Sequence, residues 1–241
     1  MLRIGFDVDG VFANMESELI RHARLLFGED VPRRSADRGP DSFDPKDSPE
    51  PSSESPPALN KLRLTPRRQS RLWRHVQSID NFWESLDEVE PGAVRRVAHA
   101  VAERRWEVIF LTKRPGSAGA SSQVQTQRWF QAKGFALPSV FVVQGSRGRI
   151  ASALGLDIVV DDRPENCLDV LADSSARAVL VWRDDEKLLP ASVRPLGIAI
   201  VFSVAECLDL LMNIDAASRQ PPGLVDRVRK LLGLKSLNQP V

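Results

Sequence analysis

Two aspartates near the N-terminus are the residues best placed to do chemistry. Asp7 and Asp9 end an alternating apolar stretch that predicts a buried strand, and Gly10 lets the backbone turn after them. Two carboxylates in such a place repel each other unless a cation lies between them. The same pattern also occurs in Asx turns and calcium loops, although Val11 and Phe12 interrupt the ligand spacing of a calcium loop. The pair indicates metal-assisted phosphate chemistry if other segments supply the missing groups.

Two further predicted strands end in polar residues. The strand patterns at 106–111 and 157–160 lead into Thr112 and into Asp161 and Asp162. In an open parallel sheet, ligands bind beyond the carboxyl ends of the strands. Four carboxylates at one such edge would be strongly destabilising without a hard cation, and Mg²⁺ suits oxygen ligands better than zinc does. We therefore expect a magnesium-assisted phosphate site at this edge.

Strand and helix patterns alternate along most of the chain, which predicts an α/β fold with a parallel sheet covered on both faces. Further strands are expected at 139–143, 178–182 and 198–202. Helices are expected after the caps Asn14 and Thr65, after residues 91–92, at 124–133, around 150–154, and after residues 203 and 223. Residues 33–57 are mostly Ser, Pro, charged residues and Gly, so we expect a flexible, solvated insertion rather than a regulatory or partner-binding segment.

Length, charge and apolar patterning are typical of a globular protein without membrane spans. A chain of 241 residues can form one substantial core, with or without a small satellite. The net charge of +1 gives no reason to expect a nucleic acid polymer or a membrane surface as partner, and no oligomeric state follows from it. No apolar run approaches the roughly 20 residues of a membrane span, and no signal-peptide pattern is present, so we expect a cytoplasmic protein. Cys167 and Cys207 are expected as buried thiols, and His22, His75 and His99 as single surface or half-buried residues on separate helices rather than ligands.

Together these motifs resemble the haloacid dehalogenase superfamily of phosphotransferases. The resemblance rests on Asp7-Val8-Asp9-Gly10-Val11, Leu111-Thr112, a basic residue further on, and Asp161-Asp162, in that family's order. It implies a three-layer Rossmann-like fold, a Mg²⁺ cofactor and a phospho-aspartyl intermediate. The second acid, Asp9, favours phosphate chemistry, because the dehalogenases need no acid at that position.

The resemblance also implies a role for each site residue. Asp7 would be the nucleophile and Asp9 the general acid and base, while Thr112 and Lys113 would bind the phosphoryl group. The implied ligands of Mg²⁺ are Asp7, the backbone carbonyl of Asp9, Asp161 and, through water, Asp162. At the third motif this sequence departs from the family's lysine. Arg147 has the better spacing, Arg149 is the other candidate, and Lys113 is a possible helper.

A closer resemblance, to the 5′-nucleotidase type C group or 5′(3′)-deoxyribonucleotidases, comes from residues 81–86, 91–93 and 161–166. It implies a small helical cap, inserted after the first strand, whose aromatic side chains contact a base. Phe82 and Trp83 hold the matching positions, and packing of both rings between cap and core is the open alternative. Arg163 could bind a ligand or simply lie at the strand-to-helix bend.

The expected organisation is a catalytic core at 1–13 and 91–215, a helical cap at 14–90 that contains the 33–57 insertion, and a helical extension at 216–241. The expected function is a Mg²⁺-dependent phosphomonoester hydrolase that acts on a small phosphate ester, chiefly a nucleoside monophosphate as a 5′-nucleotidase does. The alternatives are a phosphatase of another metabolite, such as a sugar phosphate, and a catalytically weak phosphate-binding scaffold.

Overall fold

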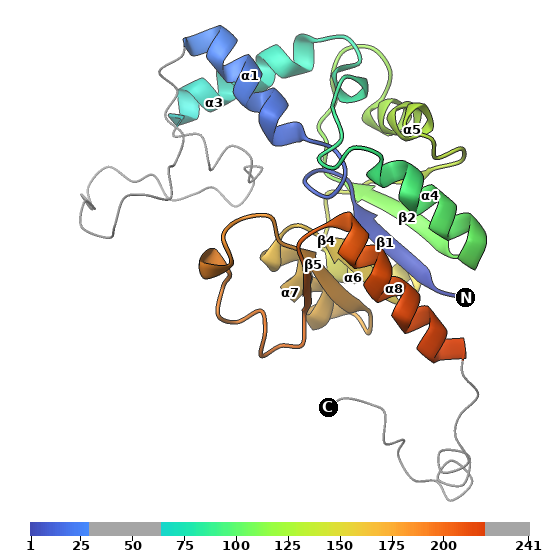
Figure 1. The fold of residues 1–241 in the computed structure, drawn as a ribbon. Coiled ribbons are helices and arrows are strands. Elements are labelled where there is room, and N and C mark those ends of the chain that lie inside the picture. Colours follow the sequence, from blue (N-terminus) through green and yellow to red (C-terminus); the bar gives the residue numbers. More distant parts are fainter. Residues whose placement is uncertain (29–63, 220–241) are drawn as a thin grey trace, which may run out of the picture.

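A parallel sheet forms the centre of the molecule. The computed structural model, drawn in Figure 1, describes residues 1–28 and 64–219. In these ranges the six strands follow the order β3-β2-β1-β4-β5-β6. Their bounds are β1 Arg3–Asp7, β2 Glu107–Thr112, β3 Ser139–Val142, β4 Ile158–Asp161, β5 Arg177–Val181 and β6 Ala199–Val201. All neighbouring strands are parallel. The predicted strands and the predicted three-layer α/β fold are confirmed.

The helices begin at the residues that the sequence marks as caps. Asn14 and Thr65 accept hydrogen bonds from Ser17 N and Arg68 N at the start of α1 and α3. The bounds are α1 Met15–Phe27, α3 Pro66–Ser78, α4 Ala93–Arg104, α5 Ser122–Ala132, α6 Arg147–Leu154, α7 Pro164–Asp173 and α8 Val204–Arg219, with short 3₁₀-helices η1 Phe82–Glu84 and η2 Glu186–Leu188.

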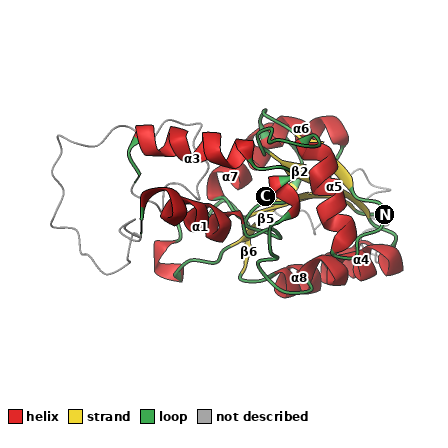
Figure 2. Ribbon diagram, turned by 90° about the horizontal axis from the view of Figure 1, so that it is seen from above, coloured by secondary structure: helices red, strands yellow, loops and turns green. Residues whose placement is uncertain are grey.

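Helices cover both faces of the sheet because successive strand residues point to opposite sides. On one side Phe6 and Phe110 pack with α4, α5 and α8, and the rings of Phe110 and Phe130 stack with centroids 3.8 Å apart. On the other side Leu111 and Val159 pack with α6 and α7. Figure 2 shows α4 and α8 on one side of the sheet and α6 and α7 on the other.

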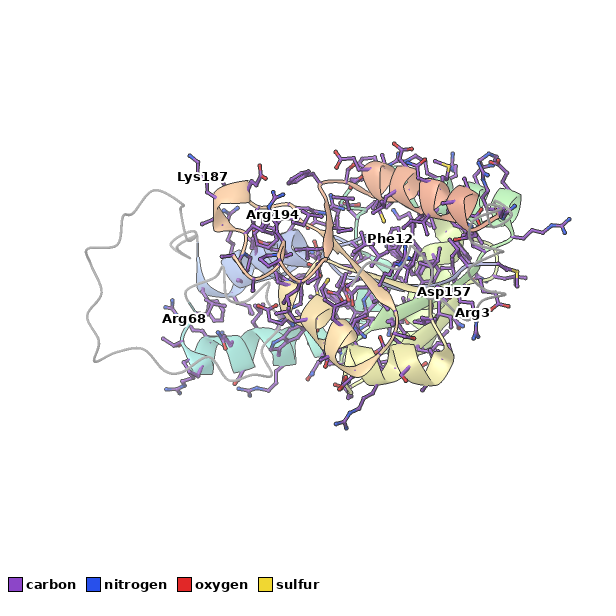
Figure 3. All side chains as sticks on the ribbon, turned by 90° about the horizontal axis from the view of Figure 1, so that it is seen from below. Arg3, Phe12, Arg68, Asp157, Lys187 and Arg194 are labelled. Carbon is purple, nitrogen blue, oxygen red and sulfur yellow. The ribbon has the colours of Figure 1, made fainter. Side chains whose placement is uncertain are left out.

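The helices α1 and α3 lie apart from these layers, beyond the carboxyl ends of the strands (Figures 1 and 2). Two segments lead to them and run side by side: Asn14 N donates to Asp87 O at 2.9 Å, and Val89 N donates to Phe12 O at 2.7 Å. At the opposite ends of the strands, Arg3 N donates to Asp157 Oδ2 at 2.8 Å, and Figure 3 shows these two residues far from Arg68 on α3.

Several expectations need correction or fall outside the described ranges. His22 is buried rather than at the surface, and it is not single, because its Nδ1 lies 3.0 Å from His75 Nε2 across the α1–α3 contact. The helix α8 continues past residue 215 to Arg219. The 33–57 insertion and the helix expected after residue 223 lie outside the described residues. Both cysteines are free and buried, as predicted. No helix in the described part of the chain is long and apolar enough to cross a membrane.

Candidate functional site

Three strand ends meet because β1 lies between β2 and β4. Asp7 is in register with Leu111 of β2, and Phe6 is in register with Val160 of β4. Thr112 and Asp161, each one residue further along, therefore lie level with Asp7 or just beyond it. The structure thus brings the polar residues of the first, second and fourth strands together at the carboxyl edge of the sheet.

A buried arginine joins two of the acids. Arg147, the first residue of α6, is 2% exposed, and its Nη2 donates to Asp7 Oδ1 while its Nε lies 3.5 Å from Asp161 Oδ2. Among the described residues, Nε and Nη1 have no hydrogen-bond partner. A buried guanidinium with N–H groups to spare is suited to bind an anion beside Asp7.

The carboxylate of Asp161 is fixed by the start of α7. Arg163 N donates to Oδ1 at 2.9 Å, and Asn166 Nδ2 lies 3.0 Å from each carboxylate oxygen. Asp161 is fully buried. Its position is therefore set by the backbone N–H just before α7 and by the Asn166 side chain in the first turn of α7.

Asp9 is held by β2 and the loop that follows it. Thr112 Oγ1 donates to Asp9 Oδ2 at 2.9 Å, and Arg114 Nη2 donates to Asp9 Oδ1 at 2.7 Å. Arg114 Nε lies 3.0 Å from both carboxylate oxygens. One hydroxyl proton serves one acceptor at a time, so Thr112 can donate to a phosphoryl oxygen only when it releases Asp9.

The turn after Asp9 is held from two sides. Gly10 has a φ of +88°, which favours glycine, and the side chain of Asp162 fills the space where a Cβ would lie. Arg183, just beyond β5, donates through Nε to Gly10 O and through Nη2 to Val11 O, both at 3.0 Å. Arg183 Nη1 also donates to Glu90 at 2.6 Å, which ties the turn to the segment before α4.

The acids repel one another in a desolvated place. Burial and the charge of Asp161 raise the pKa of Asp7 well above its ordinary value, and burial and the same charge do so for Asp162. Burial also raises the pKa of Asp161 itself. Although burial opposes it, the charges of Asp7 and Asp161 raise the pKa of Arg147, which stays charged. Arg147 thus pairs with the carboxylates of Asp7 and Asp161 while Asp162 adds a third acid nearby, and the excess negative charge suits a hard cation.

Some of the residues chosen from sequence lie elsewhere. Lys113 is exposed, and Arg149 points to α7, where its Nε lies 3.5 Å from Asp173 Oδ2, so Arg147 is the arginine at the site. Phe82 and Trp83 are both 0% exposed, so in this structure neither ring offers a face to a base. Trp83 Nε1 donates to Pro115 O at 2.9 Å, and the packing alternative describes both rings as they stand.

Sequence reasoning missed three residues. Arg114 lies two positions after Thr112 in a segment that reads as a basic loop, and its spacing from a strand end was the available signal. Asn166 lies in the first turn of α7, where a side chain can reach back to the end of β4. Arg183 follows β5 in the same way as Arg114 follows β2.

Comparisons with known proteins give a fold but no sequence family. No protein-family model matches this sequence, and a search of curated proteins finds no significant match. Among solved structures, a HAD family hydrolase from Deinococcus radiodurans R1 with bound phosphate and sodium is 14% identical, covering 88% of this chain and 95% of its own, with a TM-score of 0.50. A Thermotoga maritima protein assigned provisionally as a β-phosphoglucomutase is 17% identical, covering 89% of this chain and 100% of its own, with a TM-score of 0.51. The chain therefore has the α/β fold of the haloacid dehalogenase-like hydrolases.

Proposed function

We propose that this protein is a Mg²⁺-dependent phosphomonoester hydrolase that works through a phospho-aspartyl intermediate. The observation that carries the proposal is Arg147, buried between Asp7 and Asp161, whose nitrogens Nε and Nη1 have no hydrogen-bond partner among the described residues. These groups can bind the phosphoryl oxygens of an ester whose phosphorus faces Asp7.

The two acids divide the chemistry. Asp7 attacks phosphorus and forms an acyl phosphate, while protonated Asp9 gives its proton to the leaving oxygen. The resulting Asp9 carboxylate then takes a proton from water, which attacks the same phosphorus and releases inorganic phosphate with Asp7 restored. Thr112 and Arg147 contact the phosphoryl oxygens, whereas the exposed Lys113 takes no part in this proposal.

The donor set fits magnesium by its chemistry. Asp7 and Asp161 would supply hard oxygen donors directly and Asp162 would do so through water, and a cation would relieve the repulsion among these acids. The backbone carbonyl of Asp9 would add a neutral donor. In the described residues no three acidic, His or Cys side chains stand in an arrangement that could hold a metal ion, and Asp7 is paired with Arg147. Bound Mg²⁺ would neutralise charge on the phosphoryl group.

For the substrate class we propose a nucleoside monophosphate, which rests on the resemblance of residues 81–86, 91–93 and 161–166 to the 5′-nucleotidase type C group. In this proposal residues 14–90 form the cap over the site. Because Phe82 and Trp83 are buried, base recognition would fall to other cap residues. The likeness to the Thermotoga maritima structure makes sugar phosphates the competing class.

Phosphate release from 4-nitrophenyl phosphate, with and without Mg²⁺, tests the reaction. We expect activity that needs Mg²⁺ and is abolished in Asp7→Asn, and a loss of about 10²–10³-fold in kcat for Arg147→Ala. Arg149→Ala is the matched control, because Arg149 lies at the surface beside Asp173, and it should keep wild-type activity. A panel of ribo- and deoxyribonucleotides and sugar phosphates then sorts the substrate classes. An Asp7→Asn variant as active as the wild type would refute the proposal.

A further inference from the structure

Each of the three guanidinium nitrogens of Arg114 has a hydrogen-bond partner inside the protein. Nε and Nη2 donate to the carboxylate of Asp9, and Nη1 donates to Thr126 Oγ1 of α5 at 3.0 Å. The Thr126 hydroxyl in turn donates to Ser122 O at 2.7 Å, so its acceptor side faces Arg114. The guanidinium carbon lies 5.0 Å from the ring centroid of Trp83. Helix, loop and aromatic ring therefore fix a single position for this side chain.

The two partners of the Arg114–Asp9 ion pair differ in burial. The Arg114 side chain is 0% exposed, whereas that of Asp9 is 13% exposed. Asp9 is thus the only member of this ion pair whose side chain has exposed surface. A buried ion pair adds little net stability but is costly to break, which is the behaviour expected of a group kept for its geometry.

When phosphate binds, the orientation of the Asp9 carboxyl group depends more strongly on Arg114. When the Thr112 hydroxyl turns to a phosphoryl oxygen, it no longer holds Asp9 Oδ2. Arg114 is then the remaining described side chain that restrains the carboxyl group, and its planar fork fixes the orientation as well as the distance. Proton transfer depends on that placement, because the acid must lie within hydrogen-bond reach of the leaving oxygen.

We propose that Arg114 is a positioning residue that holds the carboxyl group of Asp9 in place for proton transfer to the leaving oxygen, an inference that rests on the proposed function. Arg114 touches no reacting atom, so it acts through Asp9. The requirement for this placement depends on the leaving group. A 4-nitrophenolate departs without a proton, whereas an alkoxide must receive one as its bond to phosphorus breaks.

The test is kcat/KM for 4-nitrophenyl, phenyl and benzyl phosphate, because kcat/KM covers the steps up to departure of the leaving group. Arg114→Lys keeps the positive charge but loses the planar pair of N–H donors. We expect this variant to lower kcat/KM by about 10²-fold for benzyl phosphate and by less than about 5-fold for 4-nitrophenyl phosphate. Since one preparation supplies both values, their ratio does not depend on the folded fraction. Asp9→Asn should change the ratio in the same direction, and adding Arg114→Lys to it should change the ratio no further.

Arg128→Lys, the same substitution at an exposed ion pair with Glu84, should leave the ratio unchanged. Equal losses on all three esters in Arg114→Lys, or a double variant whose ratio is the product of the single effects, would overturn the inference while leaving the hydrolase proposal intact. A wild-type protein that releases no phosphate from any of the three esters would overturn both.

Discussion

The side chain of Asp162 stands where a Cβ on residue 10 would have to be. Gly10 has a φ of +88°, and a Cβ built there would clash with Oδ2 and Cγ of Asp162. Because Gly10 has no side chain, the turn after β1 and the turn after β4 can pack directly against each other. This contact lets the Asp162 side chain lie against the turn that follows Asp9.

Gly10→Ala should therefore be costly. We expect it to lower the free energy of unfolding by about 2–4 kcal/mol, because left-handed backbone strain adds to overpacking against Asp162. The matched control is Gly197→Ala, where φ is +76° but no described atom lies within 4 Å of the added Cβ, so only the strain of about 1–2 kcal/mol remains. Urea unfolding compares the two variants. Equal losses would show that Asp162 simply moves aside.

Removing the charge of Asp7 should stabilise the protein without metal. Burial raises the pKa of Asp7 in the folded state, so the folded state binds more protons than the unfolded chain above pH 4. The free energy of unfolding then falls as pH rises from about 4 through the folded-state pKa, and stays low above it. In metal-free buffer we expect Asp7→Asn to be more stable than the wild type at pH 7 and to show a shallower decline. Asp209→Asn, on the exposed side of α8, controls for net charge, and a destabilised Asp7→Asn would contradict the expectation.

Magnesium should reverse that order of stability. An ion that binds only the folded state adds about 2.7 kcal/mol when its concentration is a hundred times its dissociation constant. Thermal unfolding with increasing MgCl₂ should raise the Tm of the wild type much more than the Tm of Asp7→Asn or Asp161→Asn. NaCl at matched ionic strength separates binding from screening. A parallel rise in all three proteins would argue against a site at these acids.

The His22–His75 contact predicts a second pH effect, of opposite sign. Burial and Arg21 lower the pKa of His22, while Glu18 opposes them, so below about pH 6.5 the unfolded chain binds more protons than the folded state. Stability should be complete above that pH and decline as pH falls towards the folded-state pKa. His22→Phe should flatten the decline between pH 5 and 7 in urea titrations, whereas His99→Gln, at the surface of α4, should not. An unchanged profile in His22→Phe would refute the assignment.

The sheet and the acids at its edge could be predicted because they follow from short-range patterns. Apolar runs ended by Asp7, Thr112 and Asp161 fix both the strands and the points where the chain must turn. Parallel pairing then brings those ends together without any knowledge of side-chain direction. Arg147 is preferred from the sequence for its spacing in the third motif of the family that the chain resembles, and the structure places it, as the first residue of α6, against Asp7 and Asp161.

What could not be predicted depends on the direction of side chains outside regular elements. Arg114 and Lys113 are adjacent basic residues, yet one is buried against Asp9 and the other is exposed, and no periodicity tells them apart. The His22–His75 pair joins two helices, and the chain between them includes 35 residues that the structure does not describe. No short-range sequence pattern therefore predicts this contact. Aromatic residues in a short loop carry the same ambiguity, because binding and packing use the same residue types.

Phe82 shows this ambiguity between packing and binding most clearly. Its ring packs edge-on against Trp83, with centroids 4.9 Å apart, and near His22 at 5.6 Å, with no exposed surface. We expect Phe82→Ala to lower the free energy of unfolding by about 3–5 kcal/mol, as a cavity in a packed core does. The milder Phe82→Leu should leave the ratio of kcat/KM for deoxyuridine monophosphate to that for 4-nitrophenyl phosphate unchanged. A selective loss of the nucleotide reaction would instead show that the ring becomes exposed when the substrate binds, because a ring that only packs the core affects both esters alike.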